Sequence, residues 1–138
     1  MKQLKLNYEY EVKEDLKLEF SSGNYGVNIS GSEETQARIE ISANVKQEDW
    51  VDDDLKKVVS CEYDKKQNKL TIKTNEEFDV KNIKIDVFVP KKTIVNAKTK
   101  NAHISIKTLI GSHKIQNENG PIFIADNLGD MQVTSENG

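Results

Sequence analysis

Apolar and polar residues alternate along most of this 138-residue chain, in short runs that turn residues separate. Before the last third of the chain, the alternating runs are 4–12, 16–20, 25–29, 37–45, 59–63, 70–72 and 83–89. A period of two is typical of β-strands that bury one face, because successive side chains point to opposite sides of a strand. The pattern therefore predicts an all-β protein whose first part, residues 1–90, consists of antiparallel amphipathic strands.

The segment 47–59 is the one place where the sequence also allows a helix. Three acids, Asp52 to Asp54, precede Leu55 and Val58 at helical spacing. Acids in a first turn interact favourably with the helix dipole, which supports a helix start. The same residues could instead form a loop in which Trp50 folds over the edge of a sheet.

An 18-residue repeat runs through the last part of the chain, residues 91–138. It is marked by Asn-Ala or Asn-Gly pairs that begin at 101, 119 and 137, and by glycines at 111 and 129. Between these marks, Ile104 and Ile106 recur as Ile122 and Ile124. Asn-Gly suits tight turns, and a strand-turn unit of fixed period is the signature of a stacked β-structure. The repeat predicts a short, β-helix-like β-solenoid with 18-residue coils.

The two parts are expected to form a single β domain, residues 1–138. An earlier coil is a further hypothesis, because Asn24, Val27 and Ile29 show the same offsets as the later repeats. The chain stops on Gly138, the turn glycine of a third repeat, so we expect it to be an excised part of a longer protein. A strand edge left open at that end would also allow self-association with another copy.

Composition narrows the class of function. Hydrophobic residues make up 36% of the chain and charged residues 31%, and the formal net charge is −3. This balance gives no reason to expect nucleic-acid binding. The single cysteine, Cys61, excludes an intrachain disulfide and is interpreted as a buried apolar side chain. No segment has the length and apolarity of a signal peptide or a membrane span.

Few residues stand in patterns that carry chemistry. The acids between Glu48 and Asp54 lack the spacing and the glycine of a calcium loop, and His103 and His113 lack further ligands at zinc spacing. No nucleophile motif and no glycine-rich phosphate loop occurs in the sequence. The sequence therefore predicts no catalytic residue, no cofactor and no metal site, and we do not expect an enzyme. The alternative is a carbohydrate-processing β-helix protein, because paired carboxylates meet in space and not along the chain.

The distribution of lysines is the better indication of function. Residues 81–117 contain eight lysines and one acid, whereas residues 1–80 contain eighteen acids and twelve basic residues. Outward lysines could bind an anionic polymer or lipid headgroups, or they could only keep strand edges from associating. An aromatic side chain at an outward position adds to the candidate contact surface. This surface consists of Lys98, Lys100, Lys107, Lys114 and Phe123.

The order of these features resembles a known family. Short amphipathic strands precede a strand that ends in Val89-Pro90, and repeats such as Asn119-Gly-Pro-Ile-Phe-Ile-Ala-Asp-Asn-Leu-Gly129 follow. From about Tyr8 to Gly138 the chain resembles the bacterial putative-adhesin domain of unknown function, the toast-rack family. The resemblance implies a non-enzymatic binding or scaffolding module that is associated with the bacterial envelope and with envelope stress. It implies envelope proteins or anionic envelope polymers as partners, and no catalytic residues.

Overall fold

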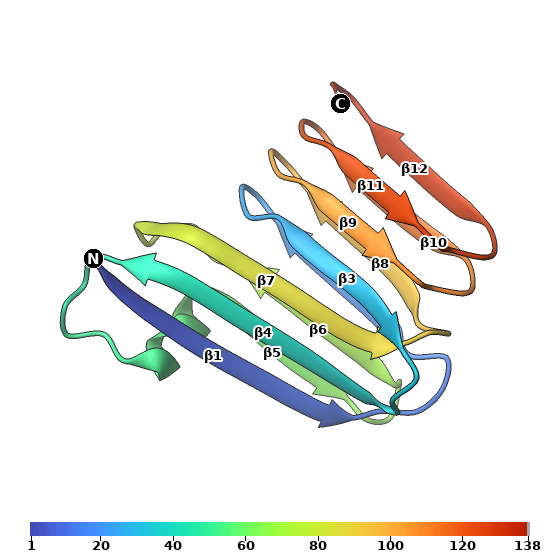
Figure 1. Ribbon diagram of the computed structural model, residues 1–138, viewed down its shortest axis with the longest axis horizontal. Coiled ribbons are helices and arrows are strands. Elements are labelled where there is room, and N and C mark those ends of the chain that lie inside the picture. The colour runs from blue at the N-terminus through green and yellow to red at the C-terminus, as the bar shows by residue number, and fades with distance from the viewer. Residues whose placement is uncertain (138) are drawn as a thin grey trace.

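The computed structural model describes residues 1–137 and shows two six-stranded sheets that face each other (Figure 1). Strands make up 59% of it and helix 4%, so the all-β prediction is confirmed. Gly138, the turn glycine of the predicted third repeat, lies outside the described residues. The elements are β1 (Lys2–Glu11), β2 (Lys17–Ser22), β3 (Val27–Ser32), β4 (Gln36–Val45), the 3-10 helix η1 (Asp52–Lys57), β5 (Val59–Asp64), β6 (Lys69–Thr74), β7 (Val80–Pro90), β8 (Ile94–Thr99), β9 (Ile104–Lys107), β10 (His113–Asn117), β11 (Ile122–Ala125) and β12 (Met131–Ser135).

Both sheets are mixed. Sheet A has the strand order β1-β4-β7-β3-β9-β11, and sheet B has the order β12-β10-β8-β2-β6-β5. In the parallel part, a strand of sheet B is followed along the chain by a strand of sheet A, and we call each such pair a rung. The rungs β6–β7, β2–β3, β8–β9 and β10–β11 lie on one another in this order, and β12 follows as the last strand of sheet B.

The spacing of the sequence repeat equals the offset between paired residues of neighbouring rungs. Ile104 pairs with Ile122, and Ile115 pairs with Val133, each at an offset of 18 residues. On its other side Ile104 pairs with Val27 of β3. The segment around Val27 therefore lies in the same register as the later repeats, as the shared offsets in the sequence predicted.

The strands β2 and β3 do not lie in the stack in the order in which they occur along the chain. Antiparallel pairing, expected throughout the first part, holds for β1 with β4, β4 with β7, and β5 with β6. The strands β2 and β3 instead pair in parallel and lie between two rungs that follow each other in the sequence. Their inward side chains, such as Phe20 and Ile29, stand in register with the inward side chains of the later rungs. In this place they are therefore covered by a neighbouring rung on each side.

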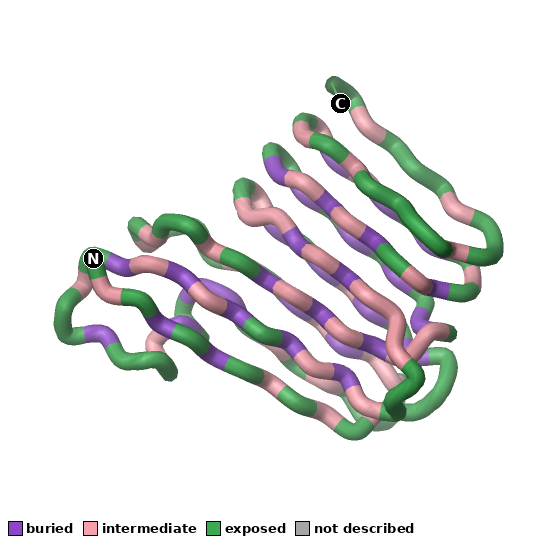
Figure 2. The backbone as a smooth tube through the Cα atoms, in the orientation of Figure 1, coloured by how far each residue is buried: buried purple, intermediate pink, exposed green. Residues whose placement is uncertain are grey.

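The hydrophobic core lies between the sheets along most of the stack. Buried and accessible residues alternate along the inner strands, and this alternation is lost on β11 and β12 (Figure 2). Ile104, Ile106 and Ile115 are buried in this core. Their repeat counterparts on β11 and β12 face the same way but lack a covering rung among the described residues.

Asparagine side chains join the corners of successive rungs. The Asn101 Nδ2 group donates a hydrogen bond to Asn24 Oδ1 at 3.0 Å, and Asn119 Nδ2 donates to Asn101 Oδ1 at 2.8 Å. Inside the corners, Thr99 Oγ1 donates to the Ala102 carbonyl and Asn117 Nδ2 donates to the Gly120 carbonyl, each at 2.8 Å. These bonds fix the register of the corners, which explains why asparagine recurs with the period of the repeat.

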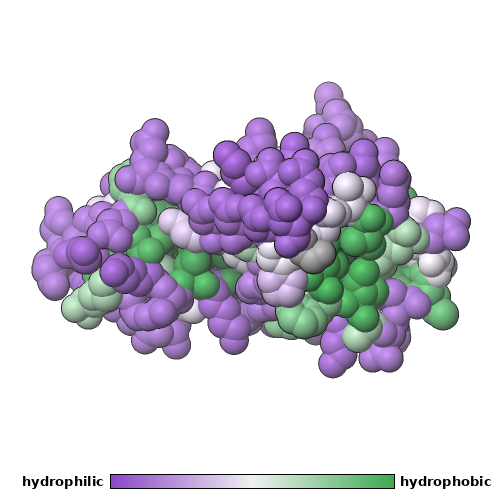
Figure 3. All heavy atoms as spheres, turned by 90° about the horizontal axis from the view of Figure 1, so that it is seen from above, coloured by the Kyte–Doolittle hydropathy of each residue, from purple (hydrophilic) through white to green (hydrophobic). Residues whose placement is uncertain are grey.

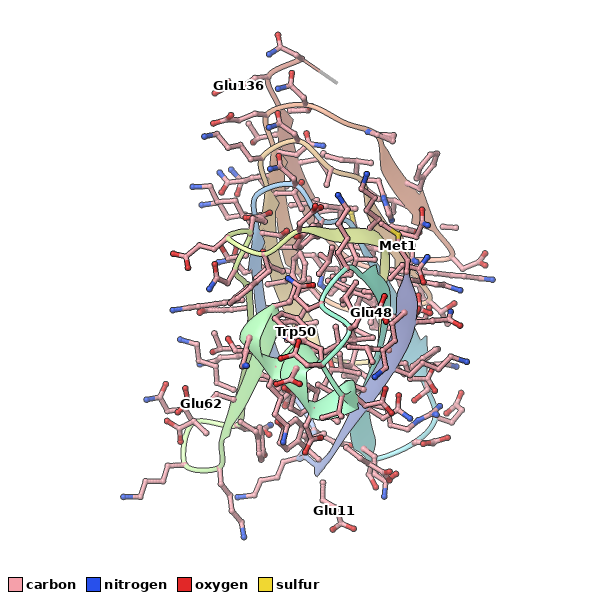
Figure 4. All side chains as sticks on the ribbon, turned by 90° about the vertical axis from the view of Figure 1, so that its left-hand side faces the viewer. Met1, Glu11, Glu48, Trp50, Glu62 and Glu136 are labelled. Atoms are coloured by element: carbon pink, nitrogen blue, oxygen red, sulfur yellow. The ribbon has the colours of Figure 1, made fainter. Side chains whose placement is uncertain are left out.

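The end of the stack near β1 and β5 is covered by η1, and we call it the closed end. Leu55 of η1 is buried in the core, and the Trp50 ring packs against Phe78 with 5.1 Å between ring centroids. Figure 4 shows Trp50 beside η1 between the two sheets. The Asp54 carboxylate accepts a hydrogen bond from the Val51 N–H at 2.7 Å, and this bond together with Lys57 lowers the Asp54 pKa. Both predictions for this segment hold in part, since a short helix forms and Trp50 folds over the sheets.

Candidate binding surface

Five adjacent strands of sheet B, namely β6, β2, β8, β10 and β12, present alternate residues on one side of the molecule. The inward positions of these strands are mostly apolar and buried, so the residues between them face solvent. The outward residues include five lysines and a single acid, Glu19. We call this surface the basic face, and its lysines are Lys17, Lys69, Lys73, Lys98 and Lys114.

Parallel registers bring lysines from distant parts of the chain together. Lys17 is the direct neighbour of Lys69, and Lys73 and Lys98 flank Ser21 from the two adjacent strands. Because neighbouring strands are about 4.8 Å apart, the Cα atoms of Lys73 and Lys98 are separated by about 10 Å. A surface hollow of about 200 Å³ lies between these two lysines. An extended anion that spans three strands could therefore contact both.

Most of this positive charge is not neutralised within the chain. Among residues 1–137, Lys69 is the only one of the five lysines that forms an ion pair, with the Glu19 carboxylate at 3.2 Å. The acids Glu62 and Asp64 also point outward, from the edge strand β5, where Asp64 is the direct neighbour of Lys69. Five lysines and one glutamate give the basic face a formal charge of +4.

The contact residues predicted from the sequence do not form one surface. Lys98 and Lys114 lie on the basic face, on the adjacent strands β8 and β10. Lys100 is exposed in the turn that follows β8. Lys107 and Phe123 project from the outer side of sheet A, because the chain crosses from one sheet to the other at each corner. The two sheets thus separate residues that are near each other in the sequence.

Three lysines of the basic face were missed by the sequence prediction. Lys17, Lys69 and Lys73 lie in a part of the chain that is rich in acids, so the local charge gave no indication of them. The sequence indicates these lysines only by their positions among the outward residues of two short strands. To assign them to one surface, one must also know that β2 and β6 pair in parallel beside β8, which depends on tertiary structure.

Other residue types singled out in the sequence are placed in structural roles. Asp52 accepts a hydrogen bond from the Lys5 N–H at 3.0 Å and thereby ties η1 to β1. Burial raises the pKa of the Cys61 thiol to about 12, which keeps it protonated at neutral pH. His103 lies 3.3 Å from Asn28 Oδ1, on the side of sheet A.

Within residues 1–137 no group of three or more histidine, cysteine or acidic side chains is placed to hold a metal ion. None of the described helical segments is long and apolar enough to cross a membrane.

His113 is a polar residue inside the core. It is the first residue of β10 and is 4% exposed, and its Nδ1 atom accepts a hydrogen bond from the Val95 N–H at 3.1 Å. Since Nδ1 is the acceptor, Nε2 carries the proton of the neutral ring. Nε2 is buried and has no hydrogen-bond partner among the described residues. Burial lowers the pKa of His113 below its ordinary value of 6.5.

Acidification is expected to destabilise the protein through His113. The folded state keeps the ring neutral while the unfolded chain takes up a proton, so this stability is present above about pH 6.5 and falls as the pH drops toward the lowered folded pKa. The loss is at most about 1.4 kcal/mol per pH unit in that window. Urea unfolding at neutral and mildly acidic pH measures it. His113→Val, which copies Val95 of the neighbouring rung, should show a smaller pH dependence, and an unchanged dependence would contradict this role.

The fold and the basic face together define an all-β protein of two facing mixed sheets with a positively charged outer surface. Its sequence matches no protein-family model and no curated protein. A protein from Clostridium sporogenes, described as a putative cell adhesion protein, has a similar structure with a TM-score of 0.53 and 10% identity, over 97% of this chain and 99% of that chain. This likeness shows the fold, and it agrees with the resemblance to the putative-adhesin domain.

Two further solved structures are similar over nearly the whole chain. A putative adhesin from Bacteroides fragilis has a TM-score of 0.38 and 11% identity, over 95% of this chain and 96% of that chain. A putative adhesin from Parabacteroides merdae has a TM-score of 0.40 and 10% identity, over 96% of each chain.

Proposed function

We propose that this chain is a non-enzymatic binding module of the bacterial cell envelope and that its basic face binds an anionic envelope polymer. The observation that carries the proposal is the set of five lysines against one acid on adjacent strands of sheet B. Charges held on a hydrogen-bonded sheet attract a polyanion without first having to be ordered. The description of the Clostridium sporogenes protein as a cell adhesion protein supports a role at the cell surface.

Carbohydrate processing, the alternative class, has weaker support. The most suitable cleft, of about 380 Å³, is lined by Glu14, Glu33 and Glu34 together with Lys91. A general acid for sugar cleavage needs a carboxyl group in an apolar pocket, where burial keeps it protonated. The Glu33 side chain is instead 84% exposed and is paired with Lys91, and Glu34 is paired with Arg38 at 3.7 Å. These carboxylates are better suited to holding the turn than to catalysis.

Co-sedimentation with purified cell wall and with anionic liposomes tests the proposal. The triple variant Lys73→Glu, Lys98→Glu, Lys114→Glu should lose at least about tenfold in affinity for cell wall, and the parent protein should lose binding at high salt. Both effects follow if attraction to the basic face is the main source of affinity. Liposomes distinguish the source of the anion, because a polymer ligand predicts retention on cell wall and little on lipid.

A matched variant separates the basic face from net charge. Lys5, Lys84 and Lys107 lie on the outer side of sheet A, and changing all three to glutamate alters the net charge by the same amount. This control should retain most of the binding. Equal losses in the two triple variants, or no binding of the parent protein at low salt, would refute the proposal.

A further inference from the structure

The starts of the parallel strands of sheet A surround a hollow in the protein surface. The strands β7, β3, β9 and β11 begin next to one another, along the upper-left side of the ribbon in Figure 1. A hollow of about 550 Å³ lies among these starts and the turns that precede them. Its volume falls within the range of about 300–1,000 Å³ that is usual for small-molecule sites. We call it the amide hollow, because Asn24, Asn82 and Asn101 line it.

The amide hollow does not depend on an unpaired strand edge. Each of β7, β3 and β9 is hydrogen-bonded to a neighbouring strand on both sides. Nine of the eleven lining residues belong to these three strands and to the turns before β3 and β9. All the asparagines, the tyrosine and the histidine of the lining are among these nine. The hollow is therefore a feature of the middle of sheet A.

Charged side chains are absent from the lining of the amide hollow. None of its eleven lining residues, all of them within residues 1–137, is an aspartate, glutamate, lysine or arginine. This is unusual for a chain in which 31% of the residues are charged and hydrophilic side chains cover most of the surface in Figure 3. The cleft beside Glu33 and the hollow between Lys73 and Lys98 both contain charged side chains. An uncharged lining favours a neutral ligand, because a charged ligand would lose water without gaining a counter-charge.

A β-bulge in β7 places Asn82 in the lining. Ser42 pairs with Lys84 and Asn44 pairs with Lys81, so β7 has one residue more than β4 between these two pairs. Asn82 lies in the bulge with a φ of 53°, a left-handed conformation that is uncommon for residues other than glycine. Bulges are frequent next to functional sites, where they re-aim a side chain. Here the bulge brings the exposed Asn82 side chain to the hollow.

His103 is fixed in the lining by two contacts. The Asn28 Nδ2 group donates to Asp86 Oδ1 at 2.9 Å, so Asn28 Oδ1 is the acceptor that lies 3.3 Å from His103 Nε2. His103 Nε2 therefore carries a proton and donates it to this hydrogen bond. The ring also packs against the backbone of Gly26, where a Cβ atom would lie 2.1 Å from His103 Nδ1. A side chain held in this way loses little further rotamer freedom when a ligand binds.

The lining combines available amide groups with apolar surface. Asn24 Oδ1 accepts a hydrogen bond from Asn101 Nδ2 at 3.0 Å, and Asn24 Nδ2 has no acceptor among residues 1–137. The Asn82 amide, within the same residues, is not hydrogen-bonded either. Tyr25 and Ile83 are partly buried against the core and add apolar surface beside these amides. An amide offers both a donor and an acceptor, which suits a ligand that carries several hydroxyl groups.

We propose that the amide hollow binds a neutral saccharide unit of a glycan. The amides of Asn24 and Asn82 hydrogen-bond to its hydroxyl groups, and the C–H groups of the sugar ring pack on Tyr25 and His103. No carboxylate of the described residues lines the hollow, so the saccharide is bound and not cleaved. The site is separate from the basic face, which lies on the outer side of sheet B and takes an anionic ligand.

NMR titration of the isotope-labelled chain with cellobiose and with N,N′-diacetylchitobiose tests this proposal. Both disaccharides are neutral, and they differ in their acetamido groups. The backbone amide resonances of Tyr25, Asn82 and His103 should shift with at least one of them. We expect a Kd of about 1 mM, because hydrogen bonds to groups that water also reaches add little net affinity. Salt should leave this Kd unchanged, since neither the disaccharide nor the lining is charged.

Asn82→Gly is the variant that tests the role of the amide. Glycine adopts a positive φ without strain but lacks the amide, so the affinity should fall by at least about fivefold while the fold is retained. Asp15→Gly is the matched control, because Asp15 is also exposed and has a φ of 59°, in the turn between β1 and β2. This control should bind as the parent protein does. His103→Ala should weaken binding as well, through loss of the ring surface.

The triple variant Lys73→Glu, Lys98→Glu, Lys114→Glu separates this site from the proposed function of the basic face. It should bind the disaccharides as the parent protein does, even if it no longer binds cell wall. Absence of shifts with both disaccharides up to about 10 mM would overturn the proposal. Shifts confined to the basic face, or equal affinity of Asn82→Gly and the parent protein, would overturn it too.

Discussion

Replacing Ile104 with alanine is expected to lower the free energy of unfolding by about 3–4 kcal/mol. Ile104 is fully buried in sheet A, where it pairs with Val27 on one side and with Ile122 on the other. Loss of the larger side chain leaves a cavity, and strands that are hydrogen-bonded on both sides cannot move to fill it. Urea unfolding followed by circular dichroism measures the change.

The same substitution at Ile122 provides the control. Ile122 is the neighbour of Ile104 on β11, the last described strand of sheet A, and is only partly buried there. Less apolar surface is lost there, so Ile122→Ala should cost about 1 kcal/mol. Equal losses for the two variants would contradict the partial burial of Ile122, because they would mean that it is covered as fully as Ile104.

Replacing Gly31 with alanine is expected to destabilise the protein by about 2–3 kcal/mol. A Cβ atom at Gly31 would overlap the Thr108 carbonyl oxygen and would lie 3.2 Å from Leu109 Cδ2. The Thr108 backbone cannot easily retreat, since its N–H donates to the Ala125 carbonyl at 3.0 Å. The substitution therefore forces β3 and the end of β9 apart, which thermal unfolding would report as a lower midpoint.

Gly23→Ala is the matched control for the close contact at Gly31. The atoms that a Cβ at Gly23 would meet belong to the Glu76 carboxylate, at 2.6 Å. That group is the end of a flexible side chain and can rotate away with the loss of the hydrogen bond that it accepts from the Asn24 N–H, so the expected cost is about 1 kcal/mol. If Gly31→Ala were no more destabilising than Gly23→Ala, the tight contact between β3 and Thr108 would be disproved.

The strands themselves could be predicted because their signal is local. Alternation in segments such as 16–20 and 37–45 reports which side of a strand faces the core, and β2 and β4 occupy these segments. The pairing of Cys61 with Ile72 and of Tyr63 with Leu70 was also foreseeable, because a short turn joins the two strands. The place of β3 was anticipated only by the offsets of Asn24, Val27 and Ile29, and the parallel pairing of β2 was not predicted, since their partners are more than forty residues away.

The candidate binding surface was likewise predictable only where its signal is local. Lys98 and Lys114 were identified from the lysine-rich segment, and the structure places them on one face. Lys107 and Phe123 were grouped with them because they are close in the sequence, but the corners send them to the opposite sheet. Charge along the chain predicts a surface only when consecutive strands share a sheet, and here they alternate between two.

The sequence by itself determined the all-β class, the inward and outward phase of most strands, and the register in which the later rungs pair. These properties depend on side-chain period and on turn residues, which act over a few neighbouring positions. Only the tertiary structure decided that β2 and β3 enter the middle of the stack, that five lysines meet on sheet B, and that η1 closes the end near β1 and β5. Those outcomes depend on which distant apolar faces cover each other, and the free energy of that burial is set by the whole chain.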